Sequence, residues 1–156
     1  INTFVAFGDA KSRGRCKLDY NKMVKVPIKK IDGEEEKIIN ELVNRIIKFK
    51  EDFNFKKERF RSRLIQNFSF EKYPSRLETF YNLKFEDFIK EIAKNSDKKL
   101  TLKDQDEWED YFNEYKEQLQ TLNKDIDRTD KEINQMIYKL YGLTKEEIRT
   151  IEDSLT

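Results

Sequence analysis

The heptad pattern between residues 108 and 140 constrains this chain more than any other sequence feature. Side chains recur there in alternating steps of four and three residues, and nine of the ten are apolar: Trp108, Phe112, Tyr115, Leu119, Leu122, Ile126, Thr129, Ile133, Met136 and Leu140. That spacing places all ten along one side of a helix and predicts a coiled-coil seam. At about 1.5 Å per residue, a helix over residues 104–141 is roughly 57 Å long.

A second seam with the same period lies earlier in the chain. Six apolar positions and one lysine follow the same steps: Ile39, Leu42, Ile46, Phe49, Phe53, Lys56 and Phe60. Glu34, Glu35 and Glu36 come just before them, where carboxylates favour the positive end of a helix dipole. We therefore expect a helix over residues 34–66. Two long seams in one chain favour an antiparallel, coiled-coil-like helical hairpin.

Shorter helices are expected in the connection and at the end of the chain. Pro74 interrupts the connection, and helices are predicted over residues 76–82 and 84–95, with Phe80, Phe85, Phe88 and Ile92 capping the tip of the hairpin. Gly142 predicts the end of the second long helix by a left-handed C-cap. Thr144 and Glu147 then have capping-box spacing and predict a short C-terminal helix over residues 145–153. The predicted fold class is mainly α.

Residues 1–31 have a different pattern and predict a small β-containing portion. Residues 2–7 and 22–28 are rich in β-branched or apolar side chains and resemble two short strands. We therefore assign residues 1–31 to the end of a β-containing domain and residues 32–156 to a helical domain. A basic loop, residues 11–17, joins the strands. Its arginines can reach phosphates or guanine edges, although a solvated loop explains the same residues.

The charges nearly cancel in total but are unevenly distributed along the chain. Lys and Arg number 32 against 31 Asp and Glu. Residues 45–63 hold eight basic and three acidic side chains, whereas residues 101–156 hold eight basic and fifteen acidic ones. The basic flank of the first long helix is therefore expected to form salt bridges with the acidic flank of the second. Contact between the lysines of residues 45–63 and nucleic acid is the alternative.

Composition and missing motifs argue against a catalytic centre in this segment. The chain has no His, which excludes an imidazole base, and one Cys, which cannot close an internal disulfide. There is no glycine-rich phosphate loop and no nucleophile elbow. We predict no catalytic residue and no metal site. No apolar run is long enough for a membrane span, so no membrane partner and a cytoplasmic location are expected.

Three stretches resemble a known family. Residues 108–112 and 127–148, with Leu-Tyr-Gly-Leu-Thr near their end, resemble the extreme C-terminus of type IIG restriction-modification enzymes and related adenine-N6 DNA methyltransferases. Lys-Met-Val-Lys-Val-Pro-Ile at residues 22–28 resembles the strand that closes their target-recognition domain before a helical spacer. The resemblance implies a piece of a larger protein, an expectation that also fits the Ile at position 1.

The resemblance implies a role in DNA recognition without catalysis. Family members join a nuclease region, a methyltransferase core with an Asn-Pro-Pro-Tyr type motif and a target-recognition part, and this chain lacks that motif. No cofactor is expected in this segment, whereas S-adenosylmethionine and Mg are implied for the parent, an adenine-specific DNA methyltransferase with or without endonuclease activity. The implied partners are double-stranded DNA and the other domains of the parent. The candidate DNA-binding residues are Lys11, Arg13, Arg15 and Lys17.

Two other functions remain open from the sequence. The helices can serve as a structural spacer that contacts no DNA, which the near-neutral total charge favours. They can also form a self-association module in which the seams are shared between chains. Lys56 and Thr129, the polar positions on the two seams, would then set the register or the number of partners.

Overall fold

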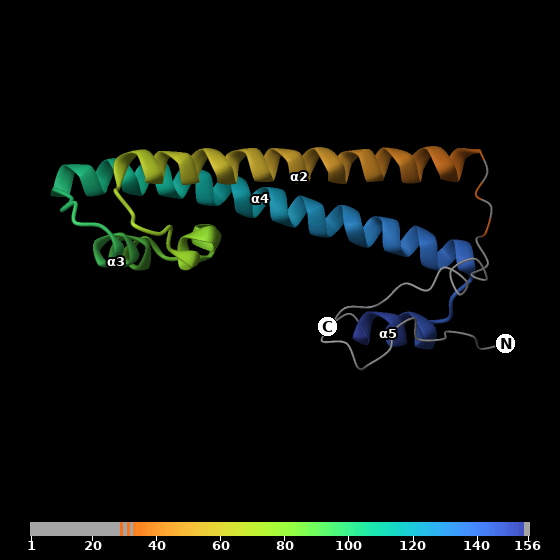
Figure 1. Cartoon of the computed structure of the whole chain (residues 1–156). Helices are drawn as coiled ribbons and strands as arrows, with labels where there is room; N and C mark the ends of the chain where they lie inside the picture. The colour runs from red at the N-terminus through yellow and green to blue at the C-terminus, as the bar shows by residue number, and fades with distance from the viewer. Residues whose placement is uncertain (1–28, 30, 32, 155–156) are drawn as a thin grey trace. The chain divides into compact units, whose positions relative to one another are not determined.

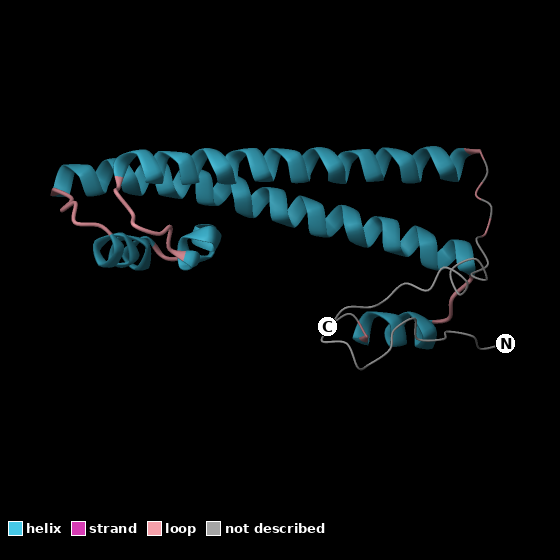
Figure 2. Cartoon of the chain, viewed as in Figure 1, coloured by secondary structure: helices cyan, strands magenta, loops and turns pink. Residues whose placement is uncertain are grey.

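The computed structural model describes residues 29, 31 and 33–154. Most of these residues are helical, and no strand occurs among them (Figure 2). The prediction of a mainly α chain is confirmed. The predicted β-containing portion and the basic loop fall in residues 1–31, which lie outside the described residues apart from positions 29 and 31.

The chain divides into two units between residues 32 and 33, and the described helices belong to the second unit. The second unit begins at Gly33, which precedes the first described helix and has φ 65°. Residues other than glycine rarely adopt a backbone φ of this sign, because their Cβ atom clashes with the backbone. A glycine therefore suits the turn that leads into the helix. The boundary predicted from the sequence lies one residue earlier, between residues 31 and 32.

Two long helices, α2 (Glu34–Asn67) and α4 (Leu102–Tyr141), lie side by side over much of their length (Figure 1). The contacts pair late residues of α2 with early residues of α4. Lys56 contacts Gln118, and Phe60 contacts Tyr115 further along α2 but earlier in α4. The two helices therefore run in opposite directions. All seventeen seam positions on α2 and α4 are buried or half-buried.

The connection between the long helices forms a second layer on this pair. It contains the 3-10 helix η1 (Ser75–Asn82) and the helix α3 (Phe85–Asn95), and both contact α4 (Figure 1). Phe60 of α2 is fully buried there, and its ring stacks on that of Phe80 with centroids 3.7 Å apart. Phe88 lies on Phe112 of α4 with centroids 4.8 Å apart. The aromatic side chains expected at the tip thus form one core with both long helices.

This core is concentrated at the end of the pair where the connection lies. Its buried members come from all four elements and from the residue that follows α2: Phe60, Leu64, Phe68, Leu77, Phe80, Phe88, Ile92, Phe112, Tyr115 and Leu119. Along the other half of α2, Leu42 is buried, whereas Ile39, Ile46 and Phe49 are half-buried. A pair of helices leaves one side of a large ring in solvent, so complete burial of the Phe60 ring needs the second layer.

Local capping explains where the last two helices begin and where α4 ends. Thr101 and Asp104 form a capping box, so α4 starts at Leu102 rather than at the predicted residue 104. Gly142 ends α4 in the left-handed conformation, as predicted. Thr144 and Glu147 form the predicted capping box at the start of α5 (Lys145–Asp153).

The capping hydrogen bonds also change the titration of their carboxylates. The backbone N–H and the hydroxyl of Thr144 both donate to the Glu147 carboxylate and lower its pKa below the ordinary 4.5. The equivalent bonds from Thr101 lower the pKa of Asp104 below 3.8. Because the pKa is lowered in the folded state, each cap stabilises its helix when the pH is above the ordinary pKa of the carboxylate. That stabilisation is lost as the pH falls through the folded-state pKa.

Replacing Phe60 by Ala should lower the free energy of unfolding by about 3–5 kcal/mol, because a fully buried ring leaves a cavity among other aromatic rings. Urea unfolding followed by circular dichroism measures this change. Phe55 is the matched control: it lies on the same helix and is 66% exposed, so Phe55→Ala should change stability by at most about 0.5 kcal/mol. Equal losses for the two variants would contradict the assigned core.

Replacing Thr144 by Ala should raise the pKa of Glu147 toward 4.5, because the hydroxyl donor is removed. Carboxyl carbon chemical shifts, followed by NMR through a pH titration, measure the change. Thr150→Ala is the control, since the Thr150 hydroxyl donates to a backbone carbonyl in the same helix and not to Glu147. An unchanged Glu147 pKa in Thr144→Ala would contradict the hydrogen bond from the Thr144 hydroxyl, since the backbone N–H donor remains in this variant.

Candidate functional site

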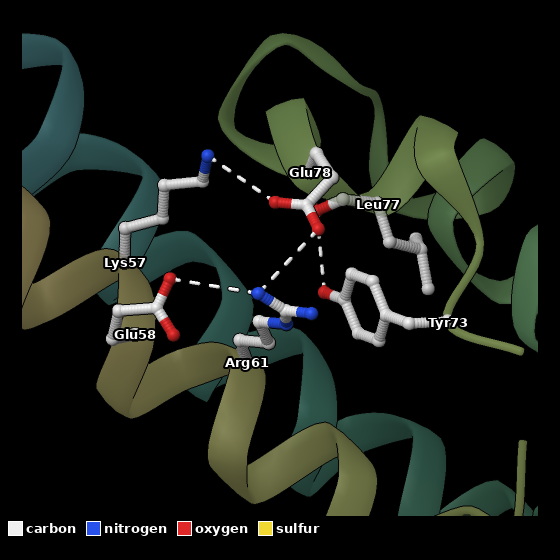
Figure 3. A network of polar contacts seen from close by, with 6 residues as sticks. All are labelled: Lys57, Glu58, Arg61, Tyr73, Leu77 and Glu78. Carbon is white, nitrogen blue, oxygen red and sulfur yellow. Dashed lines mark hydrogen bonds and ion pairs between the residues drawn. The ribbon is translucent and has the colours of Figure 1, made fainter.

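The four predicted DNA-contacting residues, Lys11, Arg13, Arg15 and Lys17, lie outside the described residues. Among the described residues, the most connected group of polar contacts joins α2 to the connection between the long helices. We call it the connector staple; it consists of Lys57, Glu58, Arg61, Tyr73, Leu77 and Glu78 (Figure 3). It is the candidate site that the structure itself presents.

Glu78 of η1 is the centre of the connector staple. One carboxylate oxygen lies 3.3 Å from Lys57 Nζ, and the other lies 3.7 Å from Arg61 Nη1. Lys57 and Arg61 are four residues apart, so one turn of α2 presents both cations on the same side. Arg61 also lies 3.7 Å from Glu58 Oε1 within its own helix. The carboxylate of Glu78 thus links the 3-10 helix to two successive turns of α2.

Tyr73 packs beneath these charges. The guanidinium carbon of Arg61 lies 4.8 Å from the centre of the Tyr73 ring, a cation–π distance. The Tyr73 hydroxyl donates a long hydrogen bond of 3.4 Å to the Leu77 carbonyl. Burial, followed by the negative charge of Glu78, raises the pKa of Tyr73 well above its ordinary value. The phenol therefore stays neutral and acts as a hydrogen-bond donor that fixes the loop before η1.

Side chains of α4 hold the connection from the other direction. Lys116 Nζ donates to the Leu83 carbonyl at 2.6 Å, and Gln120 Nε2 donates to the Tyr81 carbonyl at 2.8 Å. Both carbonyls lie at or just before the junction between η1 and α3, where local helical hydrogen bonds are incomplete. Lys98 lies between α3 and α4, and its Nζ donates to the carbonyl of Asn67, the last residue of α2, at 3.3 Å. Each of these side chains satisfies a backbone group at a helix end.

The two polar seam positions find partners within the chain. Lys56 Nζ donates to Gln118 Oε1 across the α2–α4 interface at 2.6 Å. Thr129 is 1% exposed, and its hydroxyl donates to the Asp125 carbonyl one turn earlier at 2.7 Å. Each group thus has a hydrogen-bond partner within its own chain. Their presence is therefore no argument for seams shared between molecules.

The salt bridges expected between α2 and α4 are not formed. Over the described part of the chain, no ion pair within 4.0 Å joins these two helices. Lys57 and Arg61 instead turn toward Glu78 of η1, which the charge distribution of the two seams did not indicate. The sequence prediction of flanking α2–α4 salt bridges was therefore wrong, because it ignored the second layer.

A pair of tyrosines in α4 lies beside the basic flank of α2. Tyr111 and Tyr115 have ring centroids 4.6 Å apart, and the Tyr111 ring stacks on Phe60 at 5.5 Å. Burial and a hydrogen bond with Tyr115 raise the pKa of Tyr111 to about 12, against the smaller opposing effect of Arg59 and Arg63. A phenol with so high a pKa is a poor acid or base near neutrality, and its ring is used in packing.

The polar contacts of the described residues hold parts of the helical unit together. No group of three or more potential metal ligands occurs among residues 29, 31 and 33–154. In the same residues, no helix combines the length and apolar content that crossing a bilayer requires. The connector staple, the α4 donors and the capping boxes all direct their polar groups at other parts of the helical unit. What this arrangement does is fix the positions of α2, η1, α3 and α4 relative to one another.

The fold and this network define a long helical pair braced by a short helical connection. A family model described as "Domain of unknown function (DUF8810)" matches residues 32–137, from the start of α2 to near the end of α4. The chain therefore belongs to this family. Neither the curated proteins nor the solved structures contain a match to the chain.

Replacing Glu78 by Gln should remove both ion pairs between η1 and α2 and lower stability by about 0.5–1 kcal/mol, the range for partly exposed pairs. The difference from the unchanged protein should shrink in 1 M salt, where the screening length is about 3 Å. Hydrogen exchange at the Leu77 and Leu83 amides, which bond within the connection, should become faster. Urea unfolding and exchange NMR measure these effects.

Asp87→Asn is the matched control for Glu78→Gln. It removes one carboxylate that pairs at 3.7 Å with Lys90 inside α3 and does not link the connection to α2. Its effect on the exchange of the Leu77 amide should be negligible. If both variants changed exchange equally, the connector staple would have no special role in holding η1.

Proposed function

We propose that this chain is the non-catalytic C-terminal part of a DNA restriction-modification enzyme. In this proposal residues 33–154 are a braced antiparallel helical arm, the spacer of the enzyme, and residues 1–31 are the end of a β-containing recognition domain. Adenine-N6 methylation and cleavage belong to other domains of a cytoplasmic parent, and S-adenosylmethionine and Mg bind there. The arm helps to position DNA for that chemistry.

The bracing of the helical pair is the observation that carries the proposal. At about 1.5 Å per residue, the forty residues of α4 extend over about 60 Å. Isolated long helices bend, but here aromatic rings from α2, η1, α3 and α4 pack into a single core. An enzyme that flips an adenine out of a duplex must hold the DNA in register with its active site. A braced arm can maintain such a distance.

The basic loop supplies the proposed DNA contacts. Lys11, Arg13, Arg15 and Lys17 place four cations within seven residues, a density suited to phosphate oxygens. The two arginines can also form paired hydrogen bonds with guanine. The nearly equal numbers of acidic and basic residues in the whole chain do not oppose this, since binding depends on the local charge near the phosphates.

A structural spacer without DNA contact is the second candidate. The near balance of 32 basic and 31 acidic residues favours it, because proteins that bind nucleic acid along their surface usually carry a basic excess. The polar network of the helical unit, directed inward at other helices, is equally suited to this function. The two candidates differ in whether the isolated chain has affinity for DNA.

DNA affinity of the full 156-residue chain across a salt series should separate these candidates. We expect binding of a fluorescent duplex to weaken with salt. The slope of log K, where K is the association constant, against log salt concentration is negative. Replacement of Lys11, Arg13, Arg15 and Lys17 by Ala should make this slope less negative by about 0.9 for each phosphate that the loop no longer neutralises. Fluorescence anisotropy measures both quantities. Weaker binding to all DNA sequences alike would indicate that the loop contacts phosphates.

The control variant removes four cations from the helical arm. Arg45, Lys48, Arg59 and Arg63 are exposed on α2 and form no ion pair among the described residues, so their replacement by Gln removes the same charge and tests the alternative contact between α2 and DNA. The control should keep the slope of the unchanged protein. Equal flattening by both variants would remove the loop as the specific contact. No measurable DNA binding by the unchanged chain would support the structural spacer instead.

The reading frame upstream of residue 1 offers an independent test of the parent enzyme. It should encode an Asn-Pro-Pro-Tyr type motif, because the proposed methyltransferase core must hold a flipped adenine and this chain has only two prolines, at positions 27 and 74. Sequencing of the surrounding gene provides the observation. A continuous upstream frame without that motif would contradict the restriction-modification assignment, whatever the DNA affinity of the loop.

A further inference from the structure

We draw no further inference here: the strongest candidate, the apolar surface patch formed by Val43 and Ile47 one turn apart on α2, consists of side chains that are 40% and 49% exposed, and nothing in the structure shows what covers it.

Discussion

Burial of the Phe60 ring is the interaction on which the rest of the helical unit depends. The ring lies between the two long helices and the connection, and it contacts aromatic side chains of η1, α3 and α4. A two-helix pair has little interior of its own, because each seam is covered from one direction only. The second layer packs its aromatic side chains on the Phe60 ring. That packing excludes the ring completely from water. The two long helices and their connection are therefore stabilised together.

Polar contacts act on this core by fixing its geometry. The ion pairs of Glu78 are partly exposed, so their free energy is small beside that of the buried rings. Their contribution is positional: one carboxylate sets η1 against two turns of α2, while Lys116 and Gln120 hold backbone carbonyls of the same connection from α4. Apolar packing has little directional preference, whereas hydrogen bonds and ion pairs do. The polar contacts at the edge of the core therefore favour one arrangement of the helices.

Local patterns predicted the features that depend on neighbouring residues. The 4-3 spacing located both seams, and the Thr144–Glu147 spacing predicted the start of α5. The Thr101–Asp104 box was not predicted, because its carboxylate is an aspartate instead of the usual glutamate or glutamine. The partners of Lys57 and Arg61 could not be predicted either, since Glu78 reaches them only through the packing of η1. The proposed DNA-contacting loop remains a prediction from sequence.

The uneven burial along the α2–α4 pair has a consequence for its motions. Free energies of local opening rise with the number of buried apolar contacts, so different parts of one structure open at different rates. Residues near Phe60 belong to the cluster that all four elements share, whereas Ile39 and Ile46 are only half-buried. The first turns of α2 contribute no side chain to the aromatic cluster, so backbone hydrogen bonds there can break without disturbing it. We therefore expect local opening to begin in the half of the pair beyond the second layer, while the half around Phe60 stays closed.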